Sequence, residues 1–312
     1  MAAILLGLVG LLVLTLFVDA AALRGGLTYA MDNPLGLLAA FLAYTGAFAL
    51  RALAWAPLAG GQVSLIRLFS LILAALFLNH AVPAKAGDLA RIYGLAQRGV
   101  RAGRAAASVI LARLADLVGL LVILVAFWAY AGGGDWALVA GPAGVVAAAA
   151  FAIWAFARLR IPTRPQRLAG AVAKLQDALR EASPRVLGTA LIWATPAWAL
   201  EAGILYFAAR GVGIELSFSE AVVATCFAVL VTSVPLTPGG LGTYEAGAVF
   251  VLVAFGSPPE PAFAAAVLSH AMKFLYALAA APFAFTEGLA VVRARQKSEK
   301  RKVEPDETSV EV

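Results

Sequence analysis

Long apolar runs dominate this chain and are separated by short polar connections. A helix that crosses the ~30 Å hydrocarbon core of a bilayer needs about 20 mostly apolar residues. Runs of this kind, some of them short, lie at residues 3–18, 34–57, 64–82, 104–130, 137–157, 186–208, 219–236, 241–256 and 262–289. The pattern predicts an all-α fold, a polytopic membrane helix bundle of about 7–9 spans.

The third run ends in a stretch that does not suit lipid, NHAVPAKAGDLARIYG at 79–94. Backbone that leaves a helix inside lipid needs partners from protein or from water in a cavity, so such a break usually lines a site. Pro83 and Gly87 make this break. We therefore predict an interrupted or re-entrant segment near 79–88.

A helix over Asp88–Arg101 is expected to follow this break. Its basic side carries Arg91 and Arg98. Its apolar side carries Leu89, Ile92, Tyr93, Ala96 and Val100. The free N–H groups and positive dipole end at the start of such a helix favour phosphate, and Lys85 stands just before them.

A second interruption, VPLTPGGLGTYE, lies at 234–245 and is also expected to be interrupted or re-entrant. It shares V-P-x-x-x-G with the first, so that Pro235 and Gly239 correspond to Pro83 and Gly87. Transporters built from repeated halves place interrupted helices near their substrate. Whether the two segments form a true internal repeat stays open at this point.

Lys and Arg concentrate in alternate connections. One such residue lies in 19–33, five in 83–104, seven in 158–185 and six in 291–302. The other connections, at 58–63, 131–136, 209–218 and 257–261, contain only Arg210. Because cytoplasmic loops carry the excess of Lys and Arg, the pattern predicts an external N-terminus and a cytoplasmic C-terminus.

The remaining composition completes the picture of a single membrane domain. The mean hydropathy is +0.88, and the formal net charge of +6 comes from these loops, which indicates topology and not nucleic-acid binding. Residues 162–184 suit one amphipathic helix on the cytoplasmic face. We expect one transmembrane helical domain, 1–290, and a disordered cytoplasmic tail, 291–312. A lone cysteine, Cys226, excludes an intrachain disulfide.

Three motifs together resemble a known family. They are P-x-x-x-G-D-x-x-R at 83–91, the helix SVILARLADLVGLL at 108–121, and P-x-T-P-G-G-L-G-x-x-E at 235–245. These look like the flippase-like transmembrane family that includes the membrane part of lysylphosphatidylglycerol synthase, over about residues 30–290. The resemblance implies an integral bacterial or archaeal membrane protein that handles or translocates polar lipids.

Two departures from the family qualify this expectation. Lys85 stands where many relatives have arginine, which favours point-charge attraction over bidentate phosphate binding. The chain ends at Val312, which leaves no room for the soluble aminoacyl-transfer domain of the full synthase. We therefore expect a transporter-like protein and not an enzyme.

Ionisable side chains within spans cost about 2.5–3.5 kcal/mol each at the bilayer centre and are functional candidates by default. The candidate headgroup-binding residues, drawn from the two breaks and their neighbours, are Lys85, Asp88, Arg91, Arg113, Asp116, Thr237, Gly239, Gly240, Glu245 and His270.

Several of these residues keep a structural alternative. Arg113 and Asp116 can pair with each other or with neighbouring helices. Glu245 can face the break or cap nearby N–H groups. With two histidines in the chain, His270 is interpreted as a satisfied buried histidine, and neither a metal nor a cofactor is predicted.

Four further polar residues outside this set are notable. Arg51 is expected, like Arg67, to lie near a span end and to reach the headgroups. His80 is a candidate for the same cavity as Lys85, and Glu201 lies deep in its span without an identified partner.

The leading functional interpretation is a lipid flippase or translocator of the prokaryotic cytoplasmic (inner) membrane. It would handle an anionic or polyprenyl-type polar lipid in envelope lipid biosynthesis, with Asp88, Glu245 and His270 as candidates for proton coupling. The alternatives are a non-catalytic membrane partner of a lipid- or hopanoid-biosynthesis enzyme and an intramembrane lipid-headgroup enzyme. The sequence contains no Ser-His or His-rich cluster for the last of these. The expected partners are membrane lipids and, as an open option, lipid-biosynthesis enzymes, with no nucleic acid; the oligomeric state is not predicted.

Overall fold

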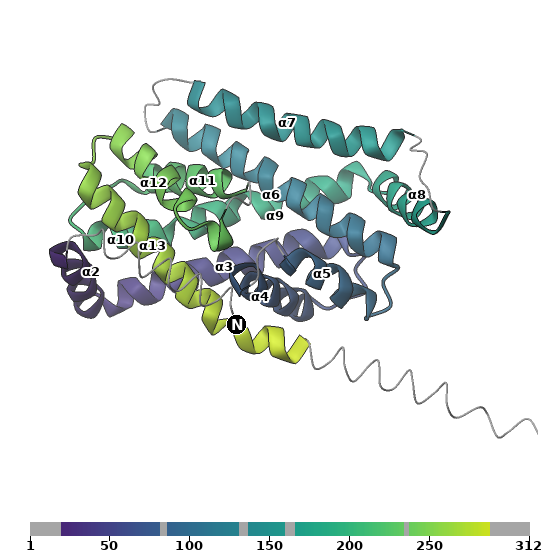
Figure 1. Cartoon of the computed structure of the whole chain (residues 1–312), viewed down its shortest axis with the longest axis horizontal. Helices are drawn as coiled ribbons and strands as arrows, with labels where there is room; N and C mark the ends of the chain where they lie inside the picture. Colours follow the sequence, from purple (N-terminus) through teal and green to yellow (C-terminus); the bar gives the residue numbers. More distant parts are fainter. Residues whose placement is uncertain (1–19, 82–85, 131–136, 160–165, 234–236, 288–312) are drawn as a thin grey trace, which may run out of the picture.

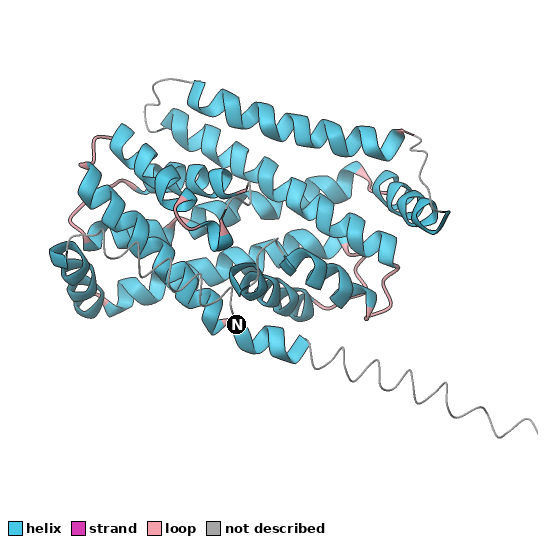
Figure 2. Ribbon diagram, in the orientation of Figure 1, coloured by secondary structure: helices cyan, strands magenta, loops and turns pink. Residues whose placement is uncertain are grey.

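The computed structural model describes residues 20–81, 86–130, 137–159, 166–233 and 237–287. Within these residues every regular element is a helix, and short loops join them (Figure 2). The predicted all-α membrane bundle is therefore confirmed. The first predicted span, 3–18, and the tail after 287 lie outside the described residues.

Four long apolar helices form the frame of the bundle. They are α3 (Pro34–Leu58), α6 (Ala102–Tyr130), α9 with its continuation α10 (Pro184–Glu201 and Gly203–Gly211), and α13 (Pro259–Ala279), which continues to Glu287. Each is long and apolar enough to cross a membrane. Helix α7 (Ala137–Arg158) runs beside α6, and Figure 1 shows these helices aligned roughly along the long axis of the molecule.

The first predicted break is the tip of a helical hairpin. Helix α4 (Leu65–Ala81) and helix α5 (Ala86–Ala96) are about 26 Å and 17 Å long, short of the ~30 Å needed to cross. A Cβ on Gly87 would lie 2.3 Å from the Ala75 carbonyl oxygen, and one on Gly94 would lie 2.4 Å from Leu71. Later residues of α5 thus meet earlier residues of α4, so the pair is antiparallel and re-entrant.

This close approach makes Gly87 a sensitive position. In Gly87→Ala the new methyl group meets fixed backbone of α4, so the helices must separate, and overpacking of this kind costs about 1–3 kcal/mol. Gly188→Ala is the matched control, because Gly188 lies inside α9 with open space around it and alanine favours a helix. Thermal unfolding in detergent is expected to show a lower Tm for the first variant only. Equal Tm values would contradict the tight hairpin.

The second predicted break is the tip of a second hairpin. Helix α11 (Phe218–Thr232) and helix α12 (Thr243–Ala254) are about 23 Å and 18 Å long and flank the 3-10 turn η1 (Pro238–Gly240). A Cβ on Gly247 would lie 2.8 Å from Ala228 Cα, and one on Gly240 would lie 2.9 Å from Thr232. These contacts again indicate an antiparallel pair.

The two hairpins approach each other from opposite ends of the bundle. In Figure 1, α11 and α12 lie in the left half, with α4 and α5 to the right of them. Their tips meet, since η1 contacts α4 and a Cβ on Gly239 would lie 4.0 Å from His80 Cδ2. The prolines and valines of the shared V-P-x-x-x-G motif, together with Lys85, lie outside the described residues.

The hairpins change which connections share an end of the bundle. Gly60, between α3 and α4, lies beside Arg104, because a Cβ on Gly60 would be 3.0 Å from the Arg104 guanidinium carbon. The alternation predicted for 58–63 and 83–104 is therefore wrong. The physical reason is that the α4–α5 hairpin begins and ends at the same end of the bundle. The connections before and after it therefore share that end.

A similar correction applies near the start of the described chain. The connection predicted at 19–33 is mostly a helix, α2 (Ala20–Asp32). A Cβ on Gly25 would lie 3.4 Å from the Gly211 carbonyl oxygen, so α2 lies at the end that holds the 209–218 loop. We call this end, with α2 and the loops after α10 and α12, the opposite end.

The other end, which we call the basic end, gathers most cationic residues of the described connections. The described Arg and Lys residues there include Arg67, Arg98, Arg101, Arg104, Arg158, Lys174, Arg180 and Arg185. The predicted amphipathic helix is α8 (Gln166–Arg180), which lies at this end and closes α7: the Gln176 side chain donates to the Phe156 and Leu159 carbonyls. Arg98 pairs with Glu287, which places the end of the α13 segment there as well.

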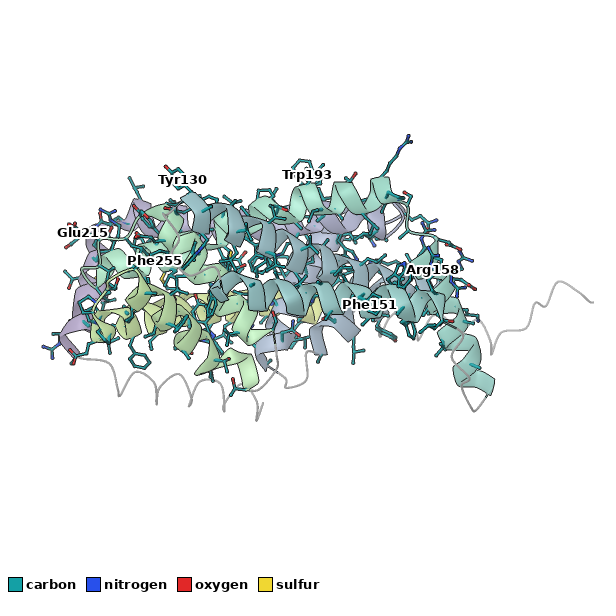
Figure 3. All side chains as sticks on the ribbon, turned by 90° about the horizontal axis from the view of Figure 1, so that it is seen from above. Tyr130, Phe151, Arg158, Trp193, Glu215 and Phe255 are labelled. Atoms are coloured by element: carbon teal, nitrogen blue, oxygen red, sulfur yellow. The ribbon has the colours of Figure 1, made fainter. Side chains whose placement is uncertain are left out.

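The outer surface is apolar, as expected of a bundle that meets lipid. Figure 3 shows Phe151 and Trp193 on the outside of α7 and α9, and Tyr130 at the end of α6. All three are exposed, as are Leu35 and Ile192. Exposed large apolar side chains along these helices match the bilayer interior as solvent.

Candidate functional site

A cavity of about 240 Å³ lies where the two hairpin tips meet the middle of α3, α6, α9 and α13. Its charged lining residues are Arg51, Arg91, Arg113, Lys273, Asp116 and Glu201. Both histidines, His80 and His270, also line it. Four cations and two carboxylates line the cavity, and Asp88 pairs with two of the cations from outside the lining. An excess of positive charge therefore remains near the middle of the long apolar helices.

One wall of the cavity is a buried network of charges that joins four helices. Arg51 on α3 lies 2.7 Å from Glu201 on α9 and 3.5 Å from Asp116 on α6. Lys273 on α13 lies 2.9 Å from the other oxygen of Glu201. The expectation that Arg51 reaches the headgroups is wrong, because its guanidinium lies 4.3 Å from the Trp198 ring inside the bundle.

Arg91 forms part of the opposite wall, on α5. Arg91 is buried at 6% exposure, whereas Leu89 and Tyr93, from the apolar side of the predicted helix, are exposed. Membrane helices can turn apolar residues to lipid and polar ones inward, which reverses the rule for helices in water. The helix also ends at Ala96 and not at Arg101, with positive φ at Gly99.

The Arg91 guanidinium has partners on two sides and a free donor. It lies over the Trp55 ring at 4.0 Å, and its Nη1 lies 3.6 Å from Asp88. Its buried Nε has no hydrogen-bond partner. A buried donor without a partner is costly, and Arg91 is one of the residues that line the cavity.

Arg113 and Asp116, on the same face of α6, pair with neighbouring helices and not with each other. Arg113 Nη2 lies 3.0 Å from Asp88 Oδ1 and its Nε lies 3.1 Å from Oδ2, while Asp116 turns to Arg51. The Arg113 side chain is 44% exposed. Of the two alternatives open in the sequence, the interhelical one is therefore confirmed.

The start of α5 differs from the predicted anion site. The Gly87 N–H donates to the Asn79 side-chain oxygen at 2.9 Å, so this amide is already occupied. The Asp88 carboxylate also stands in the first turn, where it interacts favourably with the helix dipole. An anion in the cavity would therefore meet arginine side chains instead of a bare helix end.

The second hairpin tip is held by a histidine and a carboxylate. His270 Nδ1 on α13 lies 2.6 Å from Glu245 Oε1, and His270 Nε2 lies 3.1 Å from the Gly239 carbonyl oxygen. Glu245 Oε2 accepts from the Gly242 N–H at 2.7 Å. Glu245 thus faces the break and caps α12 at once, and His270 is the satisfied buried histidine that the sequence indicated.

The rest of this tip is a tight turn. Gly239, Gly240 and Gly242 all have positive φ, a conformation that other residues rarely adopt. The Thr237 hydroxyl donates to the Leu241 carbonyl at 2.7 Å. Thr237 and Gly240 therefore shape the turn. Of the predicted site residues Thr237, Gly239 and Gly240, Gly239 lines the cavity.

Sequence reasoning left Arg51, Glu201 and Lys273 out of the site. Each is an ionisable residue within a long apolar helix, and that signal was available in the sequence. What the sequence lacked was the partner, because Arg51 and Glu201 are 150 residues apart. Lys85 is the one predicted site residue that lies outside the described residues.

Residues 1–281 match the protein family described as "Lysylphosphatidylglycerol synthase TM region". The match spans both hairpins and every helix that lines the cavity. The comparisons with curated proteins and with solved structures return no match.

Proposed function

Since the chain belongs to the lysylphosphatidylglycerol synthase transmembrane family, as its three motifs predicted, we propose that it translocates an anionic polar lipid between the leaflets of a prokaryotic cytoplasmic membrane. The observation that carries the proposal is the cationic cavity between the hairpin tips. Four cations and two carboxylates line it near the middle of the long apolar helices, which is unfavourable in lipid unless a polar ligand or water enters.

The size of the cavity suits a headgroup and not a whole lipid. Pockets for drug-sized ligands measure about 300–1,000 Å³, and this cavity measures about 240 Å³. A lipid phosphate would accept from Arg91 Nε and from the Arg113 guanidinium in charge-assisted bonds. The acyl chains would remain in the bilayer.

Arg113 supplies a route by which a headgroup reaches the cavity. It lies 11 residues after Ala102, the first residue of α6, roughly 17 Å along the helix. A guanidinium exposed at that depth is unfavourable against acyl chains but favourable against water or a phosphate. We therefore place the lateral entrance beside the Arg113–Asp88 pair, between α5 and α6.

The distribution of charge suggests how the protein is oriented. The described connections of the basic end carry most of the Arg and Lys, whereas those of the opposite end carry Arg24 and Arg210. By the positive-inside rule the basic end faces the cytoplasm. The Glu287 end of the α13 segment would then be cytoplasmic.

Purified protein in phosphatidylcholine vesicles tests this function directly. Trace fluorescent phosphatidylglycerol, labelled on an acyl chain, is quenched from outside with dithionite, which reaches only the outer leaflet unless the lipid crosses. The protein is expected to make the inner-leaflet label accessible, and to do so faster for phosphatidylglycerol than for labelled phosphatidylcholine. Quenching no deeper than in protein-free vesicles would contradict the proposal.

A further inference from the structure

The contacts of His270 fix how many protons the His270–Glu245 pair carries. A backbone carbonyl accepts and never donates, so the 3.1 Å contact to the Gly239 oxygen requires a hydrogen on His270 Nε2. The 2.6 Å contact between Nδ1 and Glu245 Oε1 requires a second hydrogen, on one partner or the other. The observed geometry therefore contains either an imidazolium with a carboxylate or a neutral imidazole with a carboxylic acid.

Loss of this shared proton breaks one of the two contacts. If Nε2 keeps the remaining hydrogen, the Nδ1 lone pair faces a carboxylate at 2.6 Å, which is repulsive. If Nδ1 keeps it, the charge-assisted bond to Glu245 survives and the bond to Gly239 is lost. Charge-assisted hydrogen bonds are about twice as strong as neutral ones, so the second arrangement is the more stable one. The bond that breaks is the one that ties Gly239, in the hairpin tip, directly to α13.

We propose that His270 and Glu245 form a buried proton-binding site that latches the tip of the second hairpin over the cavity, so that release of its proton frees the tip. Both residues are nearly inaccessible, at 3% and 1% exposure, but His270 lines the cavity and can pass its proton to water there. If the protein translocates lipid as proposed, this site couples tip movement to a proton.

The surrounding groups set the electrostatics of the latch. On α13, Lys273 lies one turn further along, and its ammonium lies 4.7 Å from the ring of Tyr244 on α12. Tyr244 in turn lies beside His270, with ring centroids 4.7 Å apart. From α4, His80 lies on the other side of Gly239, and Glu201 on α9 holds Lys273. Lys273 is thus a cation close to the latch, and its charge is paired with Glu201.

One substitution mimics the protonated state without a proton. In Glu245→Gln the amide oxygen still accepts from Gly242, and the amide NH2 donates to Nδ1 of a neutral His270, whose Nε2–H still donates to Gly239. This variant is expected to stay latched at every pH. His270→Ala removes the donor to Gly239 and is expected to stay unlatched, with little dependence on pH.

The labelling rate of a cysteine placed at the hairpin tip reports whether the latch is closed. Leu241 is partly exposed at the tip and offers the reporter position, in a Cys226→Ala background that removes the buried native thiol. Labelling by a membrane-impermeant maleimide is followed in vesicles between about pH 5 and pH 8, the range in which histidine ordinarily titrates. At each pH the rate is divided by that of Glu245→Gln, which cancels the pH dependence of the thiol itself.

The ratio of labelling rates is expected to rise several-fold with pH in the reporter protein that keeps His270 and Glu245. In His270→Ala the ratio is expected to be high at every pH. A ratio that stays near one at every pH, or a Glu245→Gln tip that labels as fast as that of His270→Ala, would overturn the latch. Monodisperse elution of each variant excludes unfolding. Because labelling needs no lipid movement, this result is separate from the success or failure of the translocation assay.

Discussion

Replacing Glu201 with alanine is expected to lower the free energy of unfolding by about 3–5 kcal/mol, because removal of one member of a buried ion pair leaves an uncompensated charge. Glu201 holds both Arg51 and Lys273. Arg51 keeps Asp116 as a partner, whereas Lys273 keeps, within the described part of the chain, the faces of Tyr244 and Tyr44. The expected drop in Tm is on the order of 10 °C, measured by thermal unfolding in detergent.

Two comparisons make this expectation specific to the buried network. Glu215→Ala removes an exposed glutamate in the loop before α11 (Figure 3) and is expected to change the free energy of unfolding by less than about 0.5 kcal/mol. Removing both charges, in Glu201→Gln with Lys273→Met, is expected to restore part of the lost stability. A Glu201→Ala protein as stable as Glu215→Ala would show that the network does not hold the four helices together.

The second large effect concerns transport. Arg91→Ala is expected to slow translocation of labelled phosphatidylglycerol by about 10- to 150-fold, which corresponds to the ~1.5–3 kcal/mol of a hydrogen bond to a charged group. The reason is that, among the residues that the structure describes, Arg91 is the cavity-lining arginine whose buried Nε has no hydrogen-bond partner. Dithionite quenching in vesicles at equal protein density gives the rate.

Conservative and distant variants distinguish this role from a general effect of charge. Arg91→Lys is expected to retain only part of the rate, because lysine keeps the charge but loses the fork of donors and the flat stacking on Trp55. Arg67→Ala, at the exposed start of α4, is expected to transport at the native rate. Equal rates for Arg91→Ala and Arg67→Ala would exclude Arg91 from the headgroup path.

The sequence predicted the hairpins because their cause is local. Gly87 and the glycines from Gly239 to Gly242 mark where the chain must leave a helix, and those residues remain at or beside the two tips. The direction in which the chain continues after each break could not be predicted from local sequence. That α5 folds back on α4 depends on close contacts such as Gly87 with Ala75, which no periodicity reveals, and so the sides assigned to 19–33 and 58–63 were wrong.

The candidate site was predicted by residue type and not by pairing. His270 and Glu245 were identified from their cost in lipid, and the structure brings them into contact. Arg91 was predicted beside the first break, and the structure buries it against the cavity. Glu201 had no visible partner, since Arg51 and Lys273 reach it from helices far apart in the chain.

A cryo-electron microscopy map of the protein in phosphatidylglycerol nanodiscs tests the central claim most directly. The expected result is phosphate density between the hairpin tips at mid-depth, within hydrogen-bond distance of Arg91 Nε and the Arg113 guanidinium. Phosphate density confined to the two headgroup layers, with the tips apart or the cavity closed by side chains, would contradict it.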